Sequence, residues 1–201
     1  MLVIGVTGGL GTGKSTVTRM LKQLGARTLD ADALAHQAIA RGTSGWRAVR
    51  RTFGPRVMTL SGEIDRRALA QIVFNDRRQL QRLCRIIHPI VIRQMARAIR
   101  ALRARRSTGV VVVDVPLLIE ARLTRTVDCV VVVTARRAQQ IQRVQRATGW
   151  PRADILRRIQ AQLPLAVKVK AADVVISNSG TTIMTRRHVR ALWKKLKAQP
   201  K

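Results

Sequence analysis

The sequence is poor in aromatic residues, in cysteine and in long apolar runs. Three Trp, two Phe and no Tyr occur among its 201 residues, so the core must be built from Val, Ile, Leu and Ala. No apolar run approaches the ~20 residues of a membrane span, and we see no secretory signal. Cys84 and Cys129 lie in apolar stretches and form no motif, which predicts buried, reduced thiols. We therefore expect a cytoplasmic protein with no membrane partner, built as one domain that can carry an inserted subdomain.

Acidic residues are also scarce. Ten Asp and Glu stand against 39 Lys and Arg, which gives a formal net charge of +29. An excess of this size can indicate nucleic-acid binding. The arginines are scattered over nearly every segment, however, without stacking aromatics or a basic tail, which favours a solvated basic surface. Nucleic acid stays open as a partner only through non-specific charge binding, and the oligomeric state is left undetermined.

The most informative stretch is Gly8-Gly9-Leu10-Gly11-Thr12-Gly13-Lys14-Ser15-Thr16, which matches G-x-x-x-x-G-K-[ST] at every specified position. The apolar, β-branched run at 2–6 predicts a short buried strand before it. Apolar residues at helical spacing follow, and Gly25 stands where a glycine would end the helix. Strand, glycine-rich turn and helix together indicate a phosphate-binding loop rather than a chance match.

The residue types of this loop suit a nucleoside triphosphate. Glycines let backbone N–H groups approach a phosphate, and the helix that begins near Lys14 points its positive end at the same anion. Lys14 is expected to reach the β- and γ-phosphates, and the Ser15 hydroxyl to bind Mg²⁺. The residues predicted to bind the nucleotide are Gly11, Thr12, Gly13, Lys14, Ser15 and Thr16.

Two carboxylates follow the second predicted strand, residues 26–29, in the sequence Asp30-Ala31-Asp32. Ligands of parallel α/β sheets bind at the carboxyl ends of strands, so both acids should face the same crevice as the loop. A carboxylate there can take a proton from an attacking substrate hydroxyl. The alternative is that Asp30 or Asp32 caps the following helix, and position alone does not separate the two.

The rest of the chain alternates between helices and strands. Residues 35–106 look helical with no convincing strand, and His88-Pro89 separates two of these helices. A buried strand at 110–114 ends in Asp114, which is placed to hold Mg²⁺ through a water. A turn into a short helix is expected after it at 115–120, then strands at 128–133 and 172–176. Thr134 is expected to cap a helix at 135–148, followed by helices at 152–163 and near the C-terminus.

This order predicts an α/β fold in which a five-stranded parallel sheet has helices on both faces. A long all-helical block between two strands predicts an inserted substrate-binding subdomain. No second ligand stands at metal spacing from His88, so a zinc site is not expected.

The sequence resembles the dephospho-coenzyme A kinase family over almost its whole length. The matching pieces are the glycine loop, Asp30-Ala31-Asp32, Phe53-Gly54, Asp65-Arg66-Arg67-Ala68-Leu69, His88-Pro89, Pro116-Leu117-Leu118-Ile119-Glu120, Gln160-Ala161-Gln162-Leu163-Pro164 and Ala172-Asp173-Val174-Val175-Ile176-Ser177-Asn178. The glycine loop alone fits many nucleotide-binding proteins, but the whole set in this order is specific.

The resemblance implies transfer of the γ-phosphoryl group of ATP to the ribose 3′-hydroxyl of dephospho-coenzyme A, with ATP and Mg²⁺ required. It also implies a P-loop kinase core at 1–34 and 107–201, a helical substrate-binding insertion at about 35–106 and a helical lid at about 143–165. Asp32 would be the general base, and Arg66 and His88 would lie in the substrate-binding subdomain. A lid arginine would clamp the phosphates: the spacing leaves Arg143 and Arg146 as candidates and favours Arg143. The alternatives are a kinase of another small hydroxyl acceptor and a P-loop nucleotide-binding protein whose partner is nucleic acid.

Overall fold

The computed structural model describes residues 1–104 and 109–198, and the chain divides into two compact units. The first comprises Met1–Asp30 and Ala101–Lys201, and the second is Ala31–Arg100. The expected insertion at 35–106 overlaps the second unit, which begins four residues earlier than its expected start. The expected boundary at 106 lies outside the described residues.

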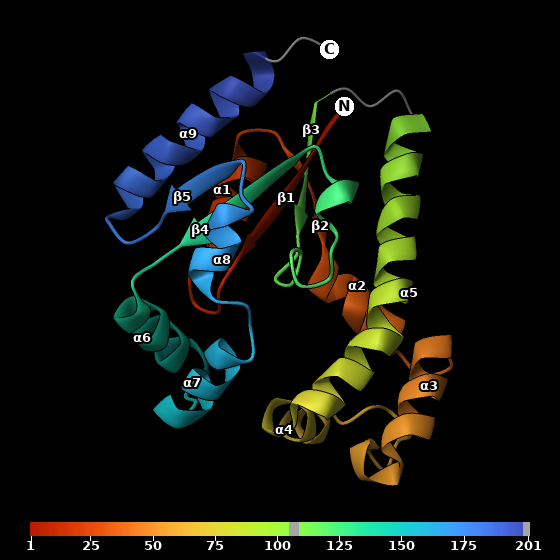
Figure 1. Ribbon diagram of the computed structural model, residues 1–201. Helices are drawn as coiled ribbons and strands as arrows, with labels where there is room; N and C mark the ends of the chain where they lie inside the picture. Colours follow the sequence, from red (N-terminus) through yellow and green to blue (C-terminus); the bar gives the residue numbers. More distant parts are fainter. Residues whose placement is uncertain (105–108, 199–201) are drawn as a thin grey trace. The chain divides into compact units, whose positions relative to one another are not determined.

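A five-stranded parallel sheet organises the first unit, and its strand order is β2-β3-β1-β4-β5 (Figure 1). The strands are β1 (Leu2–Gly8), β2 (Arg27–Asp30), β3 (Val110–Asp114), β4 (Cys129–Thr134) and β5 (Val174–Ser177). All five predicted strands are present, and none is shifted by more than two residues at its start. The predicted α/β class with a parallel sheet is confirmed.

One face of the sheet is covered by α1 (Lys14–Gln23) and α9 (Thr182–Ala198). Val17 and Leu21 of α1 pack with Val189 and Leu192 of α9 on strand residues such as Ile4. The helix α1 begins and ends as predicted. Gly25 has φ 105° after the last turn, and its N–H donates to the Lys22 carbonyl while the N–H of Ala26 donates to Leu21, a Schellman ending.

The opposite face carries strand residues that alternate with the first set, and Val3, Val111 and Val132 are fully buried there. Gly5 leaves room for a loop on this face. A Cβ atom at Gly5 would lie 2.7 Å from the Leu118 side chain, so a larger residue would displace the segment that follows β3. The glycine therefore seats the 115–123 segment against the sheet.

The first unit also contains α6 (Arg137–Thr148), α7 (Arg152–Gln160), α8 (Leu165–Lys170) and the 3₁₀ turn η2 (Thr124–Thr126). The predicted cap at Thr134 is wrong, because Thr134 still pairs with Ser177 in the sheet and Arg136 occupies the cap position. The turn predicted at 115–120 is present, but the short helix after it is wrong, because residues 116–122 form successive turns. The expected helix at 152–163 ends at Gln160, and α8 follows it.

The second unit is helical, as predicted, with α2 (Ala31–Ala38), α3 (Ser44–Phe53), the 3₁₀ turn η1 (Pro55–Val57), α4 (Arg66–Asn75) and most of α5 (Arg77–Ala104). The expected break at His88-Pro89 is wrong, because α5 runs through Pro89 as one helix (Figure 1). A proline inside a helix costs about 3 kcal/mol. Here Val91, Met95 and Ile99 continue the buried stripe beyond it, and their burial outweighs that cost.

Two further expectations concern the cysteines and membrane-spanning helices. Cys84 and Cys129 are free thiols, as predicted, but both are half-buried rather than buried. Among the described helices, none is long and apolar enough to cross a membrane.

Candidate active site

The glycine loop has the backbone that its sequence predicts. Gly11 and Gly13 have φ values of 72° and 86°, in the left-handed region that favours glycine, and α1 begins at Lys14. A Cβ atom at Gly13 would lie 2.0 Å from the Asn178 side-chain nitrogen. The turn therefore needs glycine both for its conformation and for its close packing.

Asn178, directly after β5, is hydrogen-bonded to this loop. Its buried side-chain amide donates a 2.8 Å hydrogen bond to the Thr12 carbonyl, and its Oδ1 accepts one of 2.8 Å from the Thr185 hydroxyl. The sequence alone predicts no role for Asn178. The signal was its place at the end of the Ala172–Asn178 motif, directly after the last strand.

Lys14 and Asp114 meet where β1 and β3 end. The Lys14 ammonium forms an ion pair with one carboxylate oxygen of Asp114, and the other oxygen accepts a 3.0 Å hydrogen bond from the Thr18 hydroxyl. Asp114 is only 8% exposed, and in the sheet register it lies opposite Val6 on one side and Asp30 on the other. An acid that is buried beside the phosphate lysine is suited to act on the triphosphate site. Thr18 also belongs to this cluster, although no motif in the sequence predicts its contact with Asp114.

The donors available for a metal ion suit Mg²⁺. Ser15 is exposed in the first turn of α1, and the Asp114 carboxylate lies beside Lys14, the residue before Ser15. No group of three His, Cys, Asp or Glu side chains able to hold a metal occurs within residues 1–104 and 109–198. Mg²⁺ needs none, because it keeps several waters and is held by one or two protein ligands together with substrate phosphates. Ser15 and Asp114 are therefore chemically suited to it.

Arg143 of α6 reaches the glycine loop. Its guanidinium donates a 2.8 Å hydrogen bond to the Asn178 carbonyl and a longer one of 3.4 Å to the Thr12 carbonyl. Arg146, one turn later, is exposed. The structure thus brings Arg143 to the loop, together with Lys14 and Asp114, all within the first unit.

The remaining predicted site residues belong to the second unit, on three helices. Asp32 lies in the first turn of α2, inside the helix, so Asp30 and not Asp32 precedes the first helical residue. Arg66 is the exposed first residue of α4, whose cap is Asp65, and His88 is half-buried in α5. Their catalytic and substrate-binding roles remain predictions.

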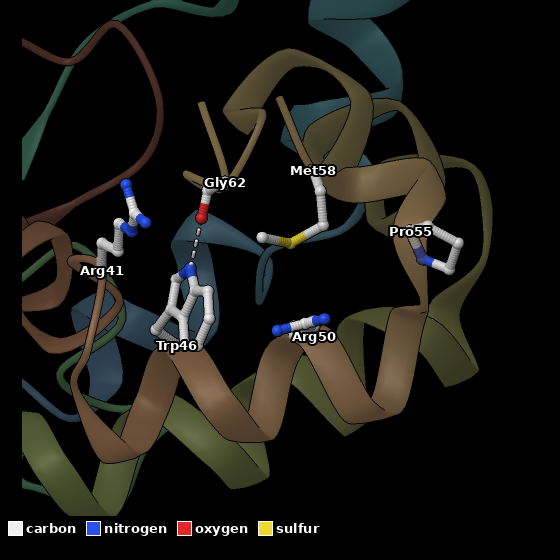
Figure 2. Close-up of a pocket in the computed structure, with 6 residues that line it drawn as sticks. All are labelled: Arg41, Trp46, Arg50, Pro55, Met58 and Gly62. Atoms are coloured by element: carbon white, nitrogen blue, oxygen red, sulfur yellow. Dashed lines mark hydrogen bonds between the residues drawn. The ribbon is translucent and has the colours of Figure 1, made fainter. Parts of the chain in front are cut away.

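A pocket of about 450 Å³ opens within the second unit (Figure 2). The Trp46 indole N–H donates to the Gly62 carbonyl at 3.0 Å, and Figure 2 shows Arg50 and Met58 beside the ring. Arg41 donates to the Ser61 carbonyl on the neighbouring turn. The full lining is Arg41, Trp46, Arg50, Pro55, Met58 and Gly62. The pocket thus combines two guanidinium groups with apolar walls.

The site combines a phosphate loop, the ion pair of Lys14 with the buried Asp114, and Arg143 at the edge of the loop. The family model for dephospho-CoA kinase matches residues 2–183. The chain belongs to the dephospho-CoA kinase family. A dephospho-CoA kinase from Geobacillus kaustophilus is 42% identical over 200 residues, covering 100% of this chain and 99% of the relative. One from Carboxydothermus hydrogenoformans is 41% identical over 197 residues, covering 97% and 94%.

Solved structures share the fold of this chain. A crystal structure from Thermus thermophilus has a TM-score of 0.80 and 33% identity, covering 97% of both chains. A dephospho-CoA kinase from Campylobacter jejuni has a TM-score of 0.70 at 21% identity, covering 98% of both. A shikimate kinase from Acinetobacter baumannii has a TM-score of 0.57 at 15% identity over 100% of this chain and 96% of its own. The last two likenesses concern the fold.

Proposed function

We propose that this protein transfers the γ-phosphoryl group of ATP to the ribose 3′-hydroxyl of dephospho-CoA, giving CoA and ADP. The observation that carries the proposal is the loop site of Lys14, Asp114 and Arg143 in a chain whose curated relatives, 41–42% identical over nearly the whole length, are named dephospho-CoA kinases. Phosphoryl transfer needs little covalent chemistry from the protein, so positioning and charge supply most of the catalysis.

The donor side is built by the loop and by α1. Backbone N–H groups from Gly11 to Thr16 surround the β-phosphate, at the positive end of the α1 dipole. Lys14, whose ammonium pairs with Asp114, would also reach the β- and γ-phosphates. Ser15, and Asp114 through a water, would hold Mg²⁺, which would supply neutralisation of the charge on the phosphate oxygens.

The acceptor side is assigned to Asp32. Asp30 ends β2 and lies opposite Asp114 in the sheet, and Asp32 follows it by two residues. Two residues span at most about 7 Å, so covalent connection alone keeps Asp32 near the carboxyl ends of the strands. Its carboxylate accepts the proton of the 3′-hydroxyl as that oxygen attacks the γ-phosphorus and the bond to the ADP oxygen breaks.

Arg143 is assigned to the charge that develops on the transferred group. Its guanidinium donates to the carbonyl of Thr12 in the loop and to that of Asn178 after β5, which holds it beside the loop that would bind the phosphates. An arginine that meets transition-state charge is worth about 10³–10⁵ in rate. The α6–α7 region around it would form the lid, which excludes water from the reacting phosphate.

The second unit is proposed to bind the acceptor. Dephospho-CoA carries a diphosphate joined to a long uncharged chain, and the Trp46 pocket offers Arg41 and Arg50 beside apolar walls. Arg50→Ala should raise KM for dephospho-CoA severalfold and leave KM for ATP unchanged. Arg51→Ala, its exposed neighbour outside the pocket lining, is the matched control.

Acceptor selectivity tests the proposed reaction. ADP release is measured with purified protein, ATP and Mg²⁺, and with dephospho-CoA, adenosine or shikimate as acceptor. We expect rapid, stoichiometric turnover with dephospho-CoA alone. Phosphorylation of another acceptor in its place would overturn the substrate assignment.

A further inference from the structure

A lysine and a glutamate that the proposed reaction does not use are paired inside the first unit. Lys168 of α8 has no exposed side-chain surface, and its ammonium lies 2.7 Å from Glu120 Oε1. The Glu120 side chain is 17% exposed. Charged side chains are almost never fully buried unless they are paired, so the position of this pair demands a reason.

The pair connects two segments that border the glycine loop. Lys168 also donates to the Pro116 carbonyl at 3.2 Å, and the same carbonyl accepts a 3.1 Å hydrogen bond from the hydroxyl of Thr7, the residue before the loop. Glu120 Oε1 accepts a hydrogen bond from the Leu163 backbone N–H at 3.2 Å. One ion pair therefore fixes the segment after β3 and the turn between α7 and α8.

That turn contacts the glycine loop itself. Gln162, next to the Leu163 N–H that Glu120 holds, accepts a 3.0 Å hydrogen bond from the backbone N–H of Leu10. The contacts close a circuit from the loop through Gln162, Glu120, Lys168 and Pro116 back to the start of the loop at Thr7.

Stability alone is a poor reason for this arrangement. Glu120 Oε2 is buried and has no hydrogen-bond partner in the part of the chain that the structure describes. A buried ion pair with an unsatisfied oxygen gains little over an apolar pair of similar volume. The effect of the ion pair is instead on geometry, because it determines where the Gln162 side chain contacts the loop.

We propose that Glu120 and Lys168 are positioning residues for ATP, which act through Gln162 by fixing the α7–α8 turn against the glycine loop. The inference rests on the proposed function, since it assigns the loop to ATP. Without the circuit, the loop loses a hydrogen bond that preorganises it, and ATP must order the loop as it binds. The binding of dephospho-CoA is not involved.

Two variants test the inference. Gln162→Leu removes the acceptor of the Leu10 N–H at nearly constant size, and Gln160→Leu, on an exposed residue two positions earlier, is its matched control. The double variant Glu120→Leu/Lys168→Met removes both buried charges together, so that neither is left unpaired. The readouts are the steady-state KM for ATP, the KM for dephospho-CoA, ATP affinity by titration calorimetry without acceptor, and the melting temperature.

We expect Gln162→Leu and the folded double variant to raise KM for ATP and weaken ATP binding about fivefold or more, as the loss of one hydrogen bond implies. KM for dephospho-CoA should stay within twofold of wild type, and Gln160→Leu should behave as wild type. A purely structural role would lower the active fraction and the melting temperature but leave KM for ATP unchanged.

An unchanged KM for ATP in Gln162→Leu, or in a double variant that melts as a folded protein, overturns the inference. If the double variant does not fold, Gln162→Leu with its control decides alone. Calorimetric ATP binding separates this failure from failure of the proposed function. A wild-type protein that binds ATP but makes no CoA refutes the function and leaves the positioning test intact.

Discussion

The side-chain amide of Asn178 donates a 2.8 Å hydrogen bond to the Thr12 carbonyl, across 166 positions of the chain. It joins the end of the last strand to the middle of the phosphate-binding loop. The Thr185 hydroxyl fixes the amide by donating to its other end. The loop therefore depends on a residue far from it in sequence.

Asn178→Asp should weaken ATP binding and lower stability. The substitution places a carboxylate oxygen against the Thr12 carbonyl where an N–H now donates, while the Thr185 hydroxyl can still donate to the other oxygen. Loss of a buried hydrogen bond with an unsatisfied acceptor costs about 1–3 kcal/mol. Urea unfolding and ATP titration measure the two effects, with Ser177→Ala, on the exposed residue before Asn178, for comparison. Wild-type ATP affinity in a folded Asn178→Asp variant would show that the loop does not need this contact.

Asp32→Asn should lower kcat by about 10²–10⁴, the usual contribution of a positioned general base. The amide cannot take the proton of the 3′-hydroxyl, while ATP affinity should hardly change because the triphosphate lies on Lys14 and the loop. Steady-state kinetics with ATP titration measures both, and Asp30→Asn is the matched control. If Asp32→Asn turns over like wild type, Asp32 is not the base.

Arg143→Ala should lower kcat about 10³-fold, at the lower end of the effect of an arginine that meets transition-state charge. Arg146→Ala, on an exposed residue one turn later, should stay within a few-fold of wild type. Arg143→Lys should recover little, because an ammonium cannot reproduce the planar guanidinium. The reverse ranking of Arg143→Ala and Arg146→Ala would transfer the clamp role to Arg146.

Both cysteines should react slowly in the folded protein. Burial raises the pKa of the Cys84 thiol, and burial followed by the charges of Asp173 and Asp128 raises the pKa of Cys129. Less thiolate is then present at pH 8 than in a free thiol, and the thiolate is the reactive form. Labelling with Ellman's reagent at pH 8 should be slower than for glutathione and should become equally fast in urea. A folded thiol that reacts as fast as glutathione contradicts these shifts.

The net charge of +29 should give binding to RNA that is non-specific and sensitive to salt. Fluorescence anisotropy with a labelled single strand should show binding at low ionic strength that is lost by ~150 mM salt and is unchanged in Lys14→Ala. Tight, sequence-dependent binding that survives this salt concentration would establish nucleic acid as a specific partner.

The parts of the fold that the sequence predicts correctly are those in which local pattern and tertiary structure agree. The glycine loop, the Schellman end of α1 at Gly25 and the apolar strands β1, β3 and β4 each carry their signal within a few residues. Errors arise where distant contacts decide. The helix α5 continues through Pro89 because buried apolar residues follow it. Thr134 stays in the sheet because Ser177 pairs with it.

The same distinction holds for the site. Lys14, Ser15 and Asp114 could be predicted because each follows a strand or opens a helix at a position that chemistry requires. The contacts of Asn178 with Thr12, of Gln162 with Leu10 and of Glu120 with Lys168 join residues 48 or more positions apart, and no periodic pattern specifies such contacts. The family motifs had marked Asn178, Gln162 and Glu120 without a role, and the structure supplies their contacts.

The group that receives the phosphate is tested most directly by identifying the product. Wild-type protein is incubated with ATP, Mg²⁺ and dephospho-CoA, and the product is analysed by mass spectrometry and ³¹P NMR. The proposed reaction predicts one new phosphate monoester on the ribose 3′-oxygen, formed in equal amount to ADP and nearly absent with Asp32→Asn. ADP formed without that product, or a phosphate at any other position of the acceptor, would contradict it.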